Sequence, residues 1–204
     1  TIIQVDKNGQ NCILLYGGAN QSITKDYVDE VLSHFEKGDI LLLQNEINLL
    51  DYIIVCAYEK EMMIILNPSP YNERLDSCDF RKISMFLLNE IEGEQVTGEK
   101  DPDKILAELR VRYPNAKVVL TLGKDGSVYQ YKEERYRQGI YQVKAVDTTA
   151  AGDTFTGYFI SSIIEGMPVQ EGLRLAAKAS AIAVSREGAT DSIPARSEVE
   201  KASL

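Results

Sequence analysis

The sequence predicts an α/β fold in which a mostly parallel sheet is covered by helices on both faces. Uninterrupted apolar runs, typical of strands buried on both sides, alternate with stretches whose apolar residues recur at helical spacing. The 204 residues, of which 44% are apolar and 26% charged, are enough for one sizeable core. Ligands of such sheets lie beyond the carboxyl ends of the strands, so polar residues at those ends are candidate site residues.

The first segment predicts a β-hairpin over residues 1–16. Its turn signal is Asp6-Lys7-Asn8-Gly9, which separates two apolar runs. A turn follows at 16–20, and Thr24 is the predicted N-cap of a helix that ends at Gly38. The apolar positions of that helix are Val28, Val31, Leu32 and Phe35.

Strands and helices alternate from Ile40 onward. The apolar runs that predict strands are 40–43, 62–66, 83–88 and 118–122. The helical patterns cover 47–58, the segment after Asp101-Pro102, 155–163 and 173–184. A meander is predicted around Tyr129 to Tyr141. This order favours a doubly covered sheet over an all-β or all-α fold.

Composition excludes some classes of function. The formal net charge of −9 argues against nucleic acid or an anionic membrane as the main partner, although backbone amides can still bind a local anion. No apolar run reaches membrane-spanning length and no signal peptide is visible. Three widely spaced cysteines, Cys12, Cys56 and Cys78, indicate reduced thiols in a cytoplasmic protein. The single histidine, His34, is predicted at the surface, which argues against a histidine-based catalytic triad.

The segment 147–155 carries the strongest chemical signal, and it reads Asp-Thr-Thr-Ala-Ala-Gly-Asp-Thr-Phe. Small residues at a helix start let backbone N–H groups approach an anion closely. Asp153 then lies in the first turn, beside whatever those groups bind. An anion cradle with a carboxylate at its edge suits phosphoryl transfer to an alcohol. The plainer alternative is a small-residue helix start, with Asp153 as a favourable first-turn charge.

The same segment resembles the C-terminal signature of the PfkB (ribokinase-like) carbohydrate kinases, and it is most similar to the ribokinase branch. Three strand ends also match the family in order: 44–46 (Gln-Asn-Glu), 89–92 (Asn-Glu-Ile-Glu) and 121–126 (Thr-Leu-Gly-Lys-Asp-Gly). The resemblance covers essentially all of the chain and leaves out the family's N-terminal portion. It implies that residues 1–16 form part of a β lid and residues 17–204 the C-terminal part of the kinase domain. Because the chain opens on a strand pattern without methionine, we expect a longer protein.

The resemblance also implies roles for individual residues. Asp153 would be the catalytic base and a sugar contact, with Ala150, Ala151 and Gly152 forming the anion hole beside it. Glu46 would contact the sugar. The ATP-binding residues would be Asn89, Thr121, Gly123, Gly126 and Gly152. Glu92 would hold Mg²⁺ through water. Without the resemblance, the same residues indicate helix caps and a tight turn.

A monovalent cation site is implied where the loop after residue 182 meets the Asp-Thr-Thr segment. The resemblance assigns K⁺ to oxygens, mostly backbone carbonyls, of Asp147, Thr149, Ala183, Arg186, Gly188 and Ser192. On pattern alone, this loop is a helix end with a glycine stop. Tyr158 departs from the small residue usual after Gly157, so it is expected to crowd either the helix packing or the pocket wall.

These observations predict an ATP-dependent sugar kinase that converts D-ribose to D-ribose 5-phosphate, with ATP, Mg²⁺ and K⁺ as cofactors. A related kinase acting on fructose, a nucleoside or a sugar acid is the alternative within the class. A non-catalytic nucleotide-binding module is the alternative outside it, if the N-terminal part is absent. The expected partners are small molecules and a second subunit, bound through the β lid.

Overall fold

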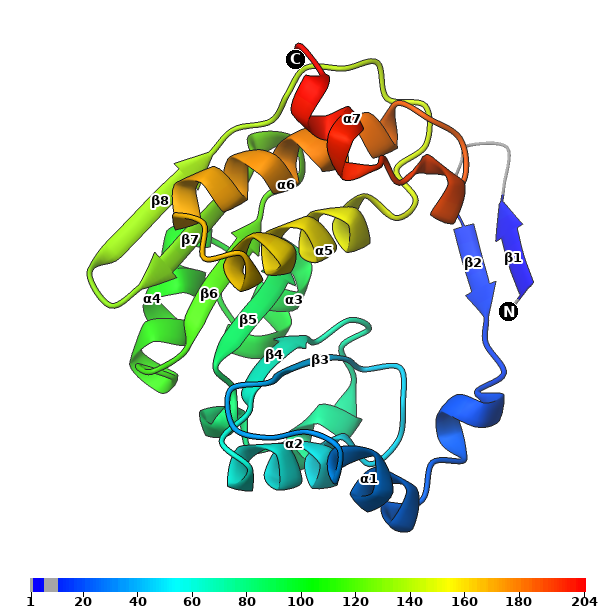
Figure 1. The fold of residues 1–204 in the computed structure, drawn as a ribbon, viewed down its shortest axis with the longest axis vertical. Helices are drawn as coiled ribbons and strands as arrows, with labels where there is room; N and C mark the ends of the chain where they lie inside the picture. Colours follow the sequence, from blue (N-terminus) through cyan, green and yellow to red (C-terminus); the bar gives the residue numbers. More distant parts are fainter. Residues whose placement is uncertain (1, 6–10) are drawn as a thin grey trace. The chain divides into compact units, whose positions relative to one another are not determined.

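The computed structural model describes residues 2–5 and 11–204, so the predicted turn at 6–9 lies outside the described residues. The chain divides into two compact units, Thr1–Ile83 and Ser84–Leu204 (Figure 1). Each unit is described by itself.

The first unit contains an antiparallel hairpin and a parallel pair of strands. Its elements are β1 (Ile2–Val5), β2 (Asn11–Leu14), α1 (Lys25–Leu32), β3 (Ile40–Gln44), α2 (Leu50–Glu59) and β4 (Met63–Asn67). β1 pairs with β2, with Ile2 opposite Leu14, which confirms the predicted strand pairing. β3 and β4 are parallel, and α2 packs on β4 with Ile54 and Ile64 fully buried.

The prediction for α1 is right at its start and wrong at its end. The Thr24 hydroxyl accepts a hydrogen bond from the Tyr27 amide at 3.2 Å, as expected of an N-cap. The helix ends at Leu32, not at Gly38. The Ser33 hydroxyl donates to the Glu30 carbonyl at 2.6 Å, so a local side-chain bond closes the last turn. Phe35 therefore lies outside the helix and is 42% exposed. His34 is exposed, as predicted.

The prediction for α2 begins too early. The helix starts at Leu50, and Ile47 lies in the preceding loop. Asn48 fixes that loop, because its side chain accepts from the Ile23 amide at 3.2 Å and donates to the Ile23 carbonyl at 2.8 Å. This contact joins residues 25 positions apart, which local periodicity does not reveal.

The second unit contains a mixed four-stranded arrangement. Its strands are β5 (Met85–Asn89), β6 (Lys117–Thr121), β7 (Ser127–Tyr131) and β8 (Glu134–Gln138). β5 and β6 are parallel, whereas β6–β7 and β7–β8 are antiparallel. The meander predicted near Tyr129 is therefore these last two strands. Leu120 and Val128 face each other in the ladder and are fully buried.

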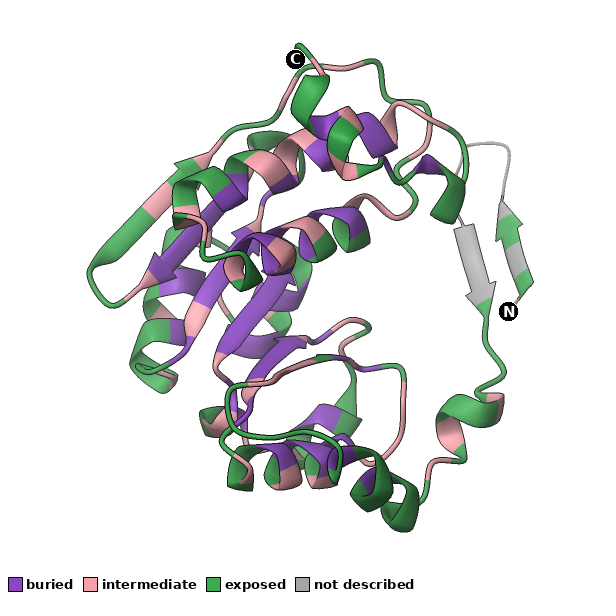
Figure 2. Cartoon of the chain, viewed as in Figure 1, coloured by how far each residue is buried: buried purple, intermediate pink, exposed green. Residues whose placement is uncertain are grey.

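Helices cover both faces of these strands. They are α3 (Glu90–Thr97), α4 (Pro102–Arg112), α5 (Ala151–Ile164), α6 (Val169–Val184) and α7 (Arg196–Lys201). α5 and α6 lie on one face and α3 and α4 on the other, and the strands between them are largely buried (Figures 1 and 2). The predicted α/β arrangement is confirmed within this unit. None of the helices in the described residues is long and apolar enough to cross a membrane.

The C-terminal segment is fixed to α5 by polar contacts. The Tyr158 hydroxyl donates to the Pro194 carbonyl at 2.6 Å, and its ring packs against a cluster that contains Ile182 and Val199. Burial raises the pKa of Tyr158. Tyr158 thus serves helix packing, and it is not among the residues that line the cavity described below.

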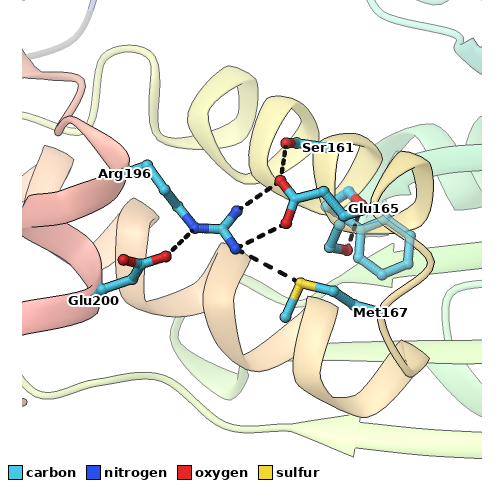
Figure 3. Close-up of polar contacts among 7 residues, drawn as sticks. Ser161, Glu165, Met167, Arg196 and Glu200 are labelled. Atoms are coloured by element: carbon cyan, nitrogen blue, oxygen red, sulfur yellow. Dashed lines mark hydrogen bonds and ion pairs between the residues drawn. The ribbon is translucent and has the colours of Figure 1, made fainter.

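Arg196 at the start of α7 makes a second connection. Its guanidinium pairs with Glu165 at 3.0 Å and with Glu200 at 2.8 Å, and it also contacts the Met167 sulfur (Figure 3). The Ser161 hydroxyl donates to Glu165 from the same helix. The pair with Glu165 holds the start of α7 against the carboxyl end of α5, whereas Glu200 lies on α7 itself.

Candidate active site

The start of α5 presents backbone amides with open space beside them. Ala150 precedes the helix with φ of 60°, a left-handed conformation, and no side chain caps the helix at this residue. Gly152 and Asp153 occupy the second and third helical positions, where amides face out of the helix end. A Cβ added at Gly152 would meet no atom within 4 Å. Asp153 is exposed in the same turn.

A cavity of about 450 Å³ borders this helix start. Its wall joins the turn after β6 to the first turn of α5 and to one side of α6. The residues predicted to bind ATP that line it are Thr121, Gly123, Gly126 and Gly152, and Ala151 also lies on its wall. Two motifs about 30 positions apart in sequence therefore share one cavity within the second unit. Asn89 is not among its lining residues.

The two glycines of the turn after β6 differ in whether a side chain would fit at their positions. Gly126 has φ of 90°, and a Cβ there would lie 2.0 Å from the Gln138 carbonyl oxygen. Only glycine fits this close approach to the end of β8. Gly123 has φ of 50° but nothing within 4 Å of an added Cβ. Space for a ligand therefore lies beside Gly123, whereas Gly126 is required by the turn itself.

Sequence reasoning missed much of the cavity wall. The loop after β8 contributes Ile140 and Val143, and α5 contributes Phe155. Apolar loop residues carry no chemical pattern, so nothing in the sequence marks them as a wall. Lys124, the fourth residue of the 121–126 motif, is exposed and also borders the cavity. Ser127 lines it too, and its buried hydroxyl has no hydrogen-bond partner within the described part of the chain.

Asp147 connects the two segments predicted to enclose a cation. One carboxylate oxygen accepts from the Thr149 hydroxyl at 2.6 Å and from the Thr149 amide at 2.9 Å. The other accepts from the Gly188 amide at 3.1 Å. These bonds, with the Thr149 hydroxyl first, lower the pKa of the Asp147 carboxyl. The amides of Val146 and Asp147 also bond the Val184 carbonyl, so the two segments lie together.

Other predicted cation ligands have hydrogen bonds of their own. The Ala183 carbonyl accepts from the Arg186 amide at 3.1 Å. The Ser192 hydroxyl donates to the Ala189 carbonyl at 2.7 Å, and the Arg186 guanidinium pairs with Glu198. The side chains of Arg186 and Ser192 are thus engaged in contacts within the chain.

Asn89 and Glu92 form a capping box at the start of α3. The Asn89 side chain accepts from the Glu92 amide at 2.9 Å, and the Glu92 carboxylate accepts from the Asn89 amide at 2.9 Å and from its side-chain nitrogen at 3.0 Å. The plain helix-start interpretation is therefore confirmed for this pair. No group of three or more His, Cys, Asp or Glu side chains that could hold a metal ion occurs within residues 2–5 and 11–204.

Glu46 lies in the first unit, just after β3. Its side chain is exposed, and its carbonyl accepts from the Gln21 side chain at 3.0 Å. The preceding Asn45 is buried and donates to the Pro70 carbonyl at 2.6 Å. Asn45 thus ties the end of β3 to the loop after β4 and leaves Glu46 at the surface of this unit.

Comparison with known proteins shows the family of the chain. The family model described as "pfkB family carbohydrate kinase" matches residues 1–196. The chain is 32% identical over 210 residues to a ribokinase of Schizosaccharomyces pombe, covering 98% of this chain and 65% of the relative. It is 34% identical over 203 residues to a ribokinase of Haemophilus influenzae, covering 96% and 66%. The chain thus spans about two thirds of the length of these relatives.

Solved structures show the same fold. The ribokinase of Thermotoga maritima has a TM-score of 0.78 at 36% identity, with 97% of this chain and 67% of that chain covered. The Arabidopsis thaliana ribokinase complexed with ribose and ATP has a TM-score of 0.81 at 29% identity, with 98% and 67% covered. The predicted ribokinase-like α/β fold is therefore confirmed. By its family match and its fold, the chain belongs to the pfkB family of carbohydrate kinases.

Proposed function

We propose that the full-length protein is an ATP-dependent sugar kinase that converts D-ribose to D-ribose 5-phosphate. The observation that carries this proposal is the cavity that joins the β6 turn to the first turn of α5. A pocket with an apolar wall, suited to a nucleotide, there meets outward-facing amides, and the carboxylate of Asp153 lies in the same turn. The similarity to ribokinases, one of them solved with ribose and ATP, supports the choice of substrates.

The proposed reaction assigns a task to each group at the helix start. The sugar hydroxyl attacks the γ-phosphorus of ATP, its proton passes to the Asp153 carboxylate, and ADP leaves with the bond between the β- and γ-phosphates broken. The amides of Gly152 and Asp153 stabilise charge on the transferring phosphoryl group. Ala150 and Ala151 keep this end of the helix small enough for close approach. Glu46 contacts the sugar.

The residues present fit the two cations in different ways. Glu92 uses both oxygens in its capping box, so it suits a hydrated Mg²⁺ held mainly by nucleotide phosphates rather than a protein cage. Magnesium would neutralise charge on those phosphates. The joined loops at Asp147 and Gly188 suit K⁺, which would be held by backbone carbonyls of the predicted set and would brace the helix start.

We also propose that β1 and β2 are part of a lid over the sugar and pair with a second subunit, and that residues 17–204 are the C-terminal part of the kinase domain. Exposed apolar side chains follow the hairpin, with Leu15 63% and Tyr16 91% exposed. Covering such side chains favours association. Cys56 and Cys78 are free thiols, which suits a cytoplasmic protein.

A kinase assay of the full-length protein tests the proposal. ADP release is measured with ATP and a panel of ribose, deoxyribose, fructose, a nucleoside and a sugar acid. Ribose should give the highest kcat/KM. Higher kcat/KM with another acceptor would assign the protein to that substrate, while ATP binding without turnover on the whole panel would favour a non-catalytic nucleotide-binding module.

A further inference from the structure

A hydrogen bond between helices fixes the first turn of α5. The Ser180 hydroxyl on α6 donates to the Ala151 carbonyl at 3.0 Å, between residues 29 positions apart. Ala151 is the first residue of α5, and both partners border the cavity. The bond therefore lies at the point where the nucleotide cavity meets the helix start.

This helix start needs support from outside. Its N-cap position is Ala150, whose side chain makes no capping hydrogen bond and whose φ of 60° lies in a region that residues with a Cβ rarely adopt. Residues 150–152 are Ala, Ala and Gly, so they offer no polar side chain to secure the turn. Ser180 supplies from α6 a polar contact that these small residues cannot make.

The geometry points to Ser180 as a positioning residue for phosphoryl transfer. Its hydrogen bond holds the Gly152 and Asp153 amides in place beside the cavity. The inference rests on the proposed kinase function. Donors stabilise a transition state only when they are fixed at the place where charge develops, and a shift of about 1 Å can cost roughly 100-fold in rate. Ser180 acts through the Ala151 carbonyl, to which its hydroxyl donates.

The test compares Ser180→Ala with Ser180→Thr in the full-length protein. Removing the hydroxyl should lower kcat by about 10-fold while the KM values for ATP and ribose change less than about 3-fold, because a loosened turn misplaces the amides mainly in the transition state. Threonine keeps the hydroxyl and should restore most of the rate. A merely structural role would lower Tm and leave kcat per folded molecule unchanged.

Ser162→Ala is the matched control. Its hydroxyl also donates to a carbonyl of α5, that of Phe159 at 2.6 Å, but Ser162 is not among the residues that line the cavity. This variant should change Tm with little effect on kcat. If Ser180→Ala keeps the wild-type kcat, or if the Thr variant is as slow as the Ala variant, the inference is overturned while the kinase function stands. A wild-type protein inactive on every sugar would overturn both.

Discussion

The Gly188 amide donates a hydrogen bond to the Asp147 carboxylate, 41 positions earlier in the chain. The same carboxylate accepts from both the amide and the hydroxyl of Thr149. One side chain thus joins the loop before α5 to the loop after α6. Since the helix start at Ala150 follows directly, the position of the proposed anion hole depends on this carboxylate.

The first prediction concerns pH. The pKa of Asp147 is lowered in the folded protein, so its charged form is favoured by folding. Its contribution to stability is therefore fully present above the unfolded pKa of about 3.9 and is lost as pH falls through the lower folded value. Asp147→Asn should reduce the loss of stability below about pH 4. Urea unfolding from pH 2.5 to 6 measures this, and identical pH profiles for both proteins would contradict it.

Asp153→Asn tests the proposed base. The variant keeps the shape of the side chain but cannot accept the proton of the sugar hydroxyl, so kcat should fall by roughly 10²–10⁴-fold with ATP binding nearly intact. Asp26→Asn is a matched control, since Asp26 is also an exposed first-turn aspartate, on α1. Steady-state kinetics and ATP titration measure both effects. Near-normal turnover of Asp153→Asn would show that another group accepts the proton.

Potassium should activate the enzyme. The loops at Asp147 and Gly188 lie together, and a cation bound by their carbonyls would hold the helix start in place. Rates in K⁺, Na⁺ and tetramethylammonium, at equal ionic strength, should be highest in K⁺. Equal rates in all three salts would show that no activating cation binds at these loops.

The strands were the most predictable part of the fold. Runs such as 63–66 are apolar on both faces, which occurs where helices cover a sheet on both sides. The start of α4 was equally clear, because the Asp101 side chain accepts from the amides of Asp103 and Lys104 ahead of a periodic segment. Helix ends were less predictable. The end of α1 and the start of α2 are fixed by side-chain hydrogen bonds of Ser33 and Asn48. The spacing of apolar residues does not reveal such bonds.

The residues of the candidate site also differ in how far the sequence predicts them. Glycine-rich and Asp-Thr-Thr segments were found because close approach to phosphate restricts residue type. Ser180 was missed because a serine in an alanine-rich helix has no distinguishing pattern, and only the folded chain brings it to Ala151. The role of Tyr158 could not be predicted for a similar reason, since its partner is the distant Pro194 carbonyl.

The Ser127→Ala substitution should leave the stability of the ligand-free protein unchanged or raise it by up to about 2 kcal/mol. The Ser127 hydroxyl is buried without a partner among the described residues, so its removal ends an uncompensated desolvation cost. Urea unfolding measures the change, with Ser162→Ala, which loses a hydrogen bond that is made, as the opposite control. Clear destabilisation by Ser127→Ala would mean that its hydroxyl has a partner in solution.

The last prediction concerns the hairpin. An isolated two-stranded hairpin is marginally stable and leaves strand edges open to pairing. Deleting residues 1–16 from the full-length protein should therefore raise the KM for ribose and weaken any dimer. The double variant Leu15→Ser with Tyr16→Ser is a milder test, because it removes the exposed apolar side chains and keeps both strands. Sedimentation velocity across a range of concentrations, together with sugar kinetics, measures both effects. A deletion variant with wild-type KM and an unchanged oligomeric state would show that the hairpin is neither a lid nor an interface.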